Sequence, residues 1–213
     1  MTQPTLQAIK DALIAGDRQG VASLTKRAMD EGIAVKDILD KALIAGMEMI
    51  GGRFKANEIF IPEVLISAKA MHAGMDILKP HFQKSGIAPA GTVVIGTVKG
   101  DLHDIGKNIV SMMLKGACFS VHDLGIDVPV EKFVEAARKE RADIVAMSSL
   151  LTTSMGAMRD TVEAFKAAGM RGQVRIIVGG APVTQDFARS IGADGFAGDA
   201  ATAVDKAREL LKH

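Results

Sequence analysis

The sequence lacks tryptophan and tyrosine, and it contains a single cysteine, Cys118. One cysteine excludes a disulfide framework and favours a cytoplasmic setting. The 25 acidic residues nearly balance the 26 Lys and Arg, so no basic surface for nucleic acid or an anionic membrane is predicted. No uncharged apolar run approaches the ~20 residues of a membrane span. The N-terminal MTQPTLQAIKDAL does not have the pattern of a signal peptide.

Hydrophobic residues make up 48% of the 213 positions, which predicts a folded chain of one large or two small domains. Before about residue 90, apolar residues such as Val64, Ala68, Met71 and Met75 recur at helical spacing. This spacing predicts an all-α four-helix bundle with helices near Thr5–Ala15, Arg18–Glu31, Val35–Phe54 and Pro62–Phe82. Asp17 is placed to cap the second helix, and Pro62 suits the first turn of the fourth. Residues Gln83–Gly91 have the composition of a linker.

After about residue 90, short apolar segments alternate with amphipathic ones. The predicted strands are Thr92–Val98, Ser120–Asp123, Ile144–Ser148, Val174–Val178 and Gly195–Ala197. The predicted helices lie near Ile105–Leu114, Val130–Arg141, Met155–Ala168, Thr184–Ser190 and Ala200–Leu211. Five such repeats indicate an α/β fold with a doubly wound, five-stranded parallel sheet of the flavodoxin-like or Rossmann-like kind. Ligands of these sheets bind beyond the carboxyl ends of the strands, in the loops that follow them.

The loop after the first strand, residues 100–107, places Asp101 two residues before His103. A metal-binding histidine commonly donates its second ring N–H to a carboxylate, which fixes the tautomer. Gly106 would allow a bulky group to approach the start of the next helix. A polar loop histidine with purely local hydrogen bonds is the alternative.

Two other kinds of site could also occupy this loop. A phosphate loop fits poorly, because Gly100 and Gly106 are one residue too far apart and Asn108 follows Lys107. A metal held by carboxylates and an imidazole would need further ligands. The remaining candidates, His72 and His122, fall in a predicted helix and a predicted strand.

Two later loops also carry unusual residues. Residues 148–154 form a cluster of hydroxyl groups with an apolar side chain at Leu150, and helix capping by Thr153 or Ser154 is the ordinary explanation. Gly179 and Gly180 either let a ligand run against bare backbone or form a tight strand-to-helix turn. The sequence leaves both explanations open.

Taken together, these elements resemble the signature DxHxxG…SxL…GG of cobalamin-binding proteins. The matching residues are Asp101, His103, Gly106, Ser148, Leu150, Gly179 and Gly180, at intervals of roughly forty and then thirty residues. The resemblance implies that cobalamin binds with its own base detached and that His103 is the lower ligand of the cobalt. It also implies that Asp101 and Ser154 relay a proton to and from His103, and that the nucleotide tail follows the later loops.

The resemblance further implies a helical cap domain at 1–90 and a cobalamin-binding domain at 91–213. The cofactor-binding residues that it implies in the second domain are Gly100, Asp101, Leu102, His103, Asp104, Ile105, Gly106, Ser148, Leu150, Thr152, Gly179, Gly180, Ala181, Phe196 and Asp199.

The helical region resembles the cap module of methionine synthases and of small corrinoid proteins of methyltransferase systems. The similarity lies in Gly51-x-x-Phe54 and in residues 58–63. It implies that Phe54 and Ile61 cover the upper face of the corrin, with Ile61 standing where methionine synthases have leucine. Both residues are also explained as part of the bundle core. A lid of this kind must open, so the linker is expected to act as a hinge.

The implied function is that of a carrier subunit without a substrate site of its own. A substrate-specific methyltransferase would load it, and a second methyltransferase would transfer the methyl group to tetrahydrofolate or a thiol. A reductive activation protein is a further implied partner. Alternatives that share the signature are a cobalamin-dependent regulator or light sensor and the small subunit of an adenosylcobalamin mutase. A flavodoxin-like protein that binds another ligand is the remaining alternative.

Overall fold

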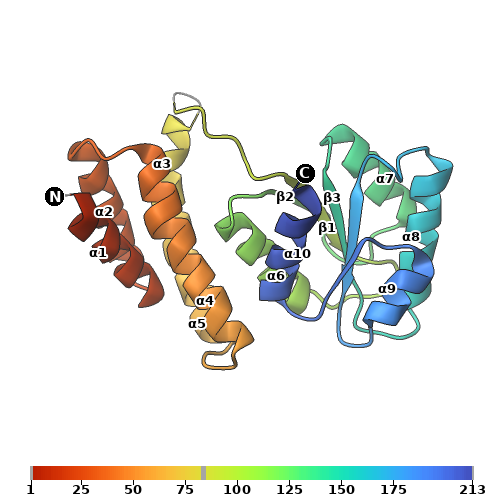
Figure 1. Ribbon diagram of the computed structural model, residues 1–213. Coiled ribbons are helices and arrows are strands. Elements are labelled where there is room, and N and C mark those ends of the chain that lie inside the picture. Colours follow the sequence, from red (N-terminus) through yellow and green to blue (C-terminus); the bar gives the residue numbers. More distant parts are fainter. Residues whose placement is uncertain (1, 83–84, 213) are drawn as a thin grey trace. The chain divides into compact units, whose positions relative to one another are not determined.

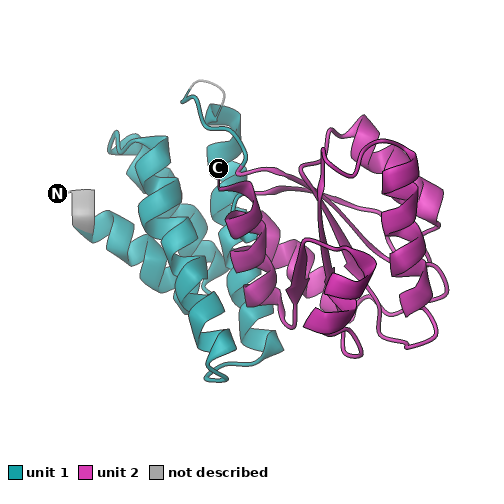
Figure 2. Ribbon diagram, turned by 45° about the vertical axis from the view of Figure 1, so that its right-hand side comes forward, with its two compact units in different colours: residues 1–89, 116–118 teal, residues 90–115, 119–213 magenta. Residues whose placement is uncertain are grey.

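The computed structural model of the chain describes residues 2–82 and 85–212. The chain divides into two compact units, residues 1–89 with 116–118 and residues 90–115 with 119–213 (Figure 2). The first unit is built from helices and the second around a parallel sheet (Figure 1). In the described part of the chain, no helix combines the length and hydrophobicity needed to cross a membrane.

The helical unit confirms the predicted bundle. Its elements are α1 (Thr2–Ile14), α2 (Arg18–Asp30), α3 (Val35–Asp37), a π-helical segment (Ile38–Ile44), α4 (Ala45–Lys55), α5 (Ile61–Leu78) and a 3₁₀ turn (Lys79–His81). Helix α3, the π-helical segment and α4 follow one another without a break, so they form one rod where a single helix was predicted. The rod, α1, α2 and α5 are the four members of the bundle.

Local chemistry and apolar burial explain where these helices lie. The Asp17 carboxylate accepts a hydrogen bond from the Gly20 backbone N–H at 2.8 Å, which confirms the predicted cap of α2. Pro62 occupies the first turn of α5, where a missing N–H costs no helical hydrogen bond. The fully buried side chains of Leu13, Leu43 and Met71 come from three different members of the bundle and form its core.

The second unit contains the five parallel strands that were predicted, and the structure shows their order to be β2-β1-β3-β4-β5. The strands are β1 (Thr92–Thr97), β2 (Ser120–Asp123), β3 (Ile144–Ser148), β4 (Arg175–Gly179) and β5 (Gly195–Ala197). The central strands β1 and β3 are almost entirely buried, which accounts for their continuous apolar sequences. The chain leaves β1 toward one edge of the sheet and leaves β3 toward the other. The loops after these two strands therefore diverge at the switch point of the sheet.

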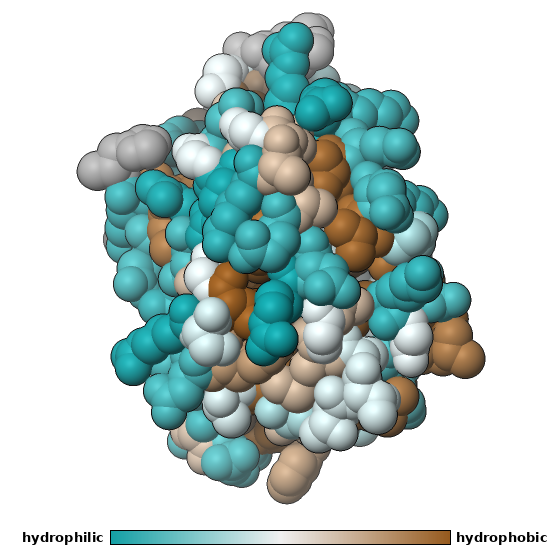
Figure 3. All heavy atoms as spheres, turned by 90° about the vertical axis from the view of Figure 1, so that its right-hand side faces the viewer, coloured by the Kyte–Doolittle hydropathy of each residue, from teal (hydrophilic) through white to brown (hydrophobic). Residues whose placement is uncertain are grey.

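Helices cover both faces of this sheet. They are α6 (Ile105–Gly116), α7 (Val130–Lys139), α8 (Met155–Ala167), α9 (Gln185–Ile191) and α10 (Ala200–Leu211). Helices α6 and α10 lie on one face, and α7, α8 and α9 lie on the other (Figure 1). A core that includes Phe133, Val162 and Ile176 lies beneath α7, α8 and α9. The outer surface on that side is mostly hydrophilic, with smaller apolar areas between (Figure 3).

Candidate functional site

The carboxyl ends of four strands lie level with one another. Thr97 of β1 pairs with Ser148 of β3, Ser148 pairs with Gly179 of β4, and Gly179 pairs with Ala197 of β5. The loops that follow these residues therefore all begin at the same end of the sheet, where the carboxyl ends of the strands lie. This register brings three of the sequence motifs together, although up to 80 residues of chain separate them.

Asp101 is the centre of the site, and its side chain is fully buried. Its Oδ1 accepts hydrogen bonds from the His103 backbone N–H at 3.0 Å and from His103 Nδ1 at 2.7 Å. Its Oδ2 accepts from the Leu150 and Leu151 backbone N–H groups at 2.6 and 3.2 Å and from Ser154 Oγ at 3.1 Å. One carboxylate thus joins the loop after β1 to the loop after β3.

These hydrogen bonds determine the charge of Asp101. Burial by itself raises the pKa of the carboxyl group, because it disfavours the charged form. The donors from His103, Leu150 and Ser154 outweigh this effect and hold the pKa well below its usual range. Asp101 is therefore an anion at neutral pH, and its charge is stabilised by hydrogen bonds from N–H and O–H donors.

The anion fixes the tautomer of His103. Because Asp101 Oδ1 can only accept, the hydrogen lies on His103 Nδ1 and the second ring nitrogen, Nε2, carries the lone pair. The His103 side chain is 53% exposed, so a ligand can reach the imidazole ring. The pairing predicted from the two-residue spacing is confirmed.

Ser154 does not cap α8, contrary to the ordinary explanation given for its loop. It occupies the N-cap position, but its side chain makes no capping hydrogen bond. Its hydroxyl instead lies near Asp101, near the Leu151 carbonyl at 3.0 Å and near Ser149 Oγ at 2.7 Å. The buried anion is the stronger acceptor and draws the hydroxyl away from the helix end.

Two residues that sequence reasoning did not single out hold the loop after β1. Thr97 is fully buried, and its hydroxyl donates to the His103 carbonyl at 2.8 Å. Asp127 accepts from the Gly100 backbone N–H at 2.7 Å, and its own N–H donates to the Asp101 carbonyl at 3.0 Å. A buried threonine on a strand and an aspartate in a later loop of the chain have no shared sequence pattern, so no signal marked Thr97 and Asp127.

The rim around His103 is apolar and exposed. Leu102 and Ile105 are 69% and 71% exposed, and Leu150 is also exposed. Gly106, in the first turn of α6, has nothing within 4 Å of the place where a Cβ would lie. Nothing in the fold therefore requires glycine at this helical position, which suits the close approach of a bulky apolar group.

Gly179 and Gly180 have a packing reason for being glycine. A Cβ on Gly180 would collide with the Ser149 backbone, and its φ of +124° is one that other residues rarely adopt. A Cβ on Gly179 would lie 2.7 Å from the Ala197 carbonyl oxygen. The turn explanation therefore holds for both residues, and a side chain at Gly180 would disturb the packing of the two loops even without a ligand.

The other predicted binding residues lie around the same edge. Ser148, Ala181 and Thr152 lie at the ends of β3 and β4 or in the loops that follow. Phe196 is half-buried on β5 and packs against the core beneath α7–α9.

Two predicted binding residues are aspartates that already have hydrogen-bond partners. Asp199 caps α10, accepting from the Thr202 N–H and hydroxyl at 2.8 Å each. Asp104 is exposed and accepts from the Asn108 side chain at 3.0 Å.

Neither of the two competing explanations of the first loop is supported by the contacts of Lys107 and the acidic side chains. Lys107 is buried and forms an ion pair with Asp123, so its ammonium group is already engaged. No group of three or more His, Cys, Asp or Glu side chains able to hold a metal occurs within residues 2–82 and 85–212.

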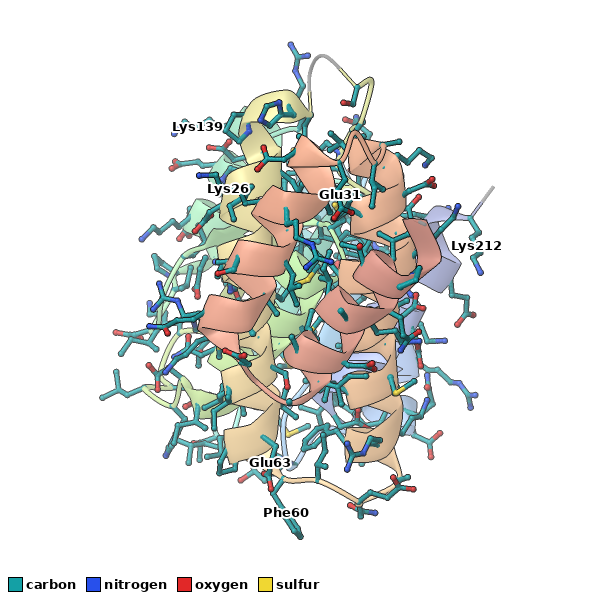
Figure 4. All side chains as sticks on the ribbon, turned by 90° about the vertical axis from the view of Figure 1, so that its left-hand side faces the viewer. Lys26, Glu31, Phe60, Glu63, Lys139 and Lys212 are labelled. Carbon is teal, nitrogen blue, oxygen red and sulfur yellow. The ribbon has the colours of Figure 1, made fainter. Side chains whose placement is uncertain are left out.

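The predicted cap residues lie at the junction of α4 and α5. Phe54 is half-buried near the end of α4, and Ile61, the first residue of α5, is 39% exposed. Between them, Phe60 is 67% exposed and points away from the helices (Figure 4). This end of the bundle therefore exposes several apolar side chains.

In comparisons with known proteins, each unit of the chain matches a family of B12-binding domains. Residues 91–208 match a family described as a B12 binding domain, and residues 5–79 match a second family of the same description. The chain is 44% identical to dimethylamine corrinoid protein 2 of Methanosarcina acetivorans, over 97% of this chain and 95% of that protein. It belongs to the corrinoid proteins.

Solved structures agree with this assignment. A cobalamin-binding protein from Desulfitobacterium hafniense has a TM-score of 0.82 and 34% identity, over 97% of this corrinoid protein and 98% of that chain. A chain of the methanol:cobalamin methyltransferase complex of Methanosarcina barkeri has a TM-score of 0.82 and 31% identity, over 99% and 86%. The apolar rim, the free His103 nitrogen and the open space at Gly106 fit a corrinoid cofactor.

Proposed function

We propose that this corrinoid protein carries a methyl group on cobalamin, with His103 as the lower ligand of the cobalt through Nε2. The observation that carries the proposal is the fixed tautomer of His103, whose Nδ1–H is held 2.7 Å from the buried anion of Asp101. A carboxylate behind an imidazole orients the ring and raises the basicity of the free nitrogen. Bound cobalamin would supply a cobalt that can accept and give up a methyl group, and the His103 nitrogen would hold that cobalt.

The charge of Asp101 specifies where a proton would go. The lowered pKa of Asp101 keeps its carboxylate ionised, so a proton taken up by the His103–Asp101 pair resides on the imidazole. Protonation at Nε2 would remove the lone pair that binds cobalt. Ser154 would support this exchange by stabilising the anion and would not itself become charged.

The partners follow from the relatives. One relative is named a dimethylamine corrinoid protein, and another structure is a methanol:cobalamin methyltransferase complex. We propose that a methyltransferase specific for a methylamine or a small alcohol loads this protein. A second methyltransferase would pass the methyl group to tetrahydrofolate or a thiol. A reductive activation protein would reduce any cobalt that has become oxidised and so return it to the active state.

The helical unit would serve as the cap. We propose residues 1–90 as the cap domain and 91–213 as the cobalamin-binding domain. Phe54 and Ile61 would shield the upper face of the corrin, and residues 83–91 would act as the hinge. Gln83 and Lys84 of that linker lie outside the described residues.

The decisive experiment is the visible spectrum of the methyl-loaded protein. His103→Ala should shift it toward that of a cobalt without a nitrogen ligand. His122→Ala is the matched control, because His122 lies on the edge strand β2 and should leave the spectrum unchanged. Bound cofactor with an unaltered spectrum in the His103 variant would contradict the assignment.

A further inference from the structure

The hydrogen-bonded chain that begins at His103 continues past Ser154 to Ser149. Ser149 Oγ lies 2.7 Å from Ser154 Oγ and 3.0 Å from the Leu151 carbonyl. Both serines are buried, Ser149 completely. Position 149 is the unspecified residue of the SxL element, so the cobalamin signature does not explain why a hydroxyl is present there.

Counting hydrogens selects one arrangement of these groups. Two oxygens only 2.7 Å apart need a hydrogen between them, so one serine donates to the other. If Ser154 donated to Ser149, Asp101 would lose a donor to its buried anion. Ser149 therefore donates to Ser154, and Ser154 donates to Asp101. The Leu151 carbonyl stays satisfied by the Ser154 backbone N–H at 3.2 Å.

The backbone of Ser149 is held in place from β4. Its N–H donates to the Gly179 carbonyl at 3.1 Å, and Gly180 packs so closely on it that a Cβ there would collide. The Ser149 hydroxyl therefore starts from a fixed point. Because a hydroxyl that receives a hydrogen bond becomes a better donor, Ser149 strengthens the bond from Ser154 to Asp101.

We propose that Ser149 is a positioning residue that directs the hydroxyl of Ser154 to Asp101 and thereby sets how strongly Asp101 holds His103. Without Ser149, the Ser154 hydroxyl no longer receives a hydrogen bond and becomes a weaker donor to Asp101. The Asp101 anion is then less stabilised by Ser154, becomes more basic and binds His103 Nδ1–H more tightly. The effect on cobalt rests on the proposed function, whereas the hydrogen-bond chain does not.

The first measurement uses the full-length apo-protein. In nitrogen-15 NMR spectra of all variants recorded at one alkaline pH, Ser149→Ala should move the His103 Nδ1–H resonance downfield. Ser154→Ala should move it in the same direction. In the double variant, the Ser149 change should add nothing, because it acts through Ser154. Ser149→Thr, which keeps the hydroxyl, should restore the wild-type resonance.

The second measurement uses the cobalamin-loaded protein. Ser149→Ala should shift the midpoint potential of the cobalt(II)/cobalt(I) couple to more negative values, because a more basic imidazole stabilises the higher oxidation state. Thermal unfolding of each variant separates this effect from a general loss of structure.

The outcomes separate the two proposals. An unchanged His103 resonance in Ser149→Ala, or fully additive shifts in the double variant, would overturn the role of Ser149. A potential that moves in none of the His103, Ser154 and Ser149 variants would instead overturn His103 as the ligand. In that case the apo-protein spectra still decide the hydrogen-bond chain.

Discussion

At the scale of single residues, Asp101 couples the site to the stability of the sheet unit. Asp101→Asn keeps the shape of the side chain but replaces one acceptor with an N–H₂ group that faces existing donors. We expect a loss of about 1–3 kcal/mol in the free energy of unfolding, since buried donors lose their partner. Chemical denaturation of the apo-protein at neutral pH measures this.

The same residue predicts a dependence of stability on pH. The pKa of Asp101 is lower in the folded protein than the roughly 3.9 of an unperturbed aspartate. Its contribution to stability is therefore fully present above that value and is lost as the pH falls below it toward the folded-state pKa. Denaturation at a series of acidic pH values should show a smaller loss in Asp101→Asn than in the wild type. Asp186→Asn, at an exposed carboxylate, should follow the wild-type curve.

Gly180 and Gly106 should respond to alanine in opposite ways. Gly180→Ala places a Cβ against the Ser149 backbone at a φ of +124°, so we expect the free energy of unfolding of the apo-protein to fall by about 1–3 kcal/mol. A variant that unfolds like the wild type would mean that the two loops separate easily. Thermal unfolding is the measurement.

Gly106→Ala should stabilise the apo-protein by up to about 1 kcal/mol, because the Cβ meets open space and alanine favours a helix. Its affinity for cobalamin should fall, since the open space is where the corrin would approach. Gly156→Ala, at the same place in α8 and also in open space, should gain stability without losing affinity. Equal affinities in both variants would remove Gly106 from the site.

At the scale of elements, the N-terminus of α10 tests whether Asp199 has two roles. Asp199→Ala should lower stability by about 1 kcal/mol, because it removes the cap that holds Thr202. Asp199→Ser keeps a capping oxygen and should leave stability unchanged. If the carboxylate also contacts the cofactor, both variants bind cobalamin less tightly. Unaltered binding by the serine variant would reduce Asp199 to a helix cap.

The elements themselves were largely predictable from the sequence. The spacing of apolar residues located the four bundle helices and the five strands within a few residues, because burial of one face produces a periodic pattern in the sequence. The π-helical winding of Ile38–Ile44 was not predictable. Ile38, Leu39, Ala42 and Leu43 are all buried there, and the same apolar pattern suits an α-helix equally well.

Within the site, the pairing of Asp101 with His103 was predictable because it depends on two neighbouring residues. The roles of Ser154 and Ser149 were not, because they depend on how the loop after β3 meets a carboxylate about fifty residues earlier in the chain. For the same reason, the sequence could not separate a ligand slot from a turn at Gly180, whose neighbour is a distant backbone.

At the scale of the whole molecule, the proposed cap is tested best at Ile61. Its partial exposure means that Ile61→Ala should cost little stability, unlike truncation of half-buried Phe54. If the cap shields the methyl group, photolysis of the methyl–cobalt bond should be faster in this variant. Ile66→Ala, at another exposed isoleucine of α5, is the matched control. Equal photolysis rates in the wild type and Ile61→Ala would argue against the cap.

The hydrogen bonds of Asp101 are complete without any ligand, and this has a thermodynamic consequence for capture of the cofactor. Thr97, Asp127 and Ser154 already hold the loop that presents His103, so binding need not order that loop. The conformational entropy lost on association should therefore be small for this segment. In calorimetry of cofactor binding, the heat-capacity change should therefore reflect the apolar surface that is buried against the cofactor, with little contribution from coupled folding of the loop.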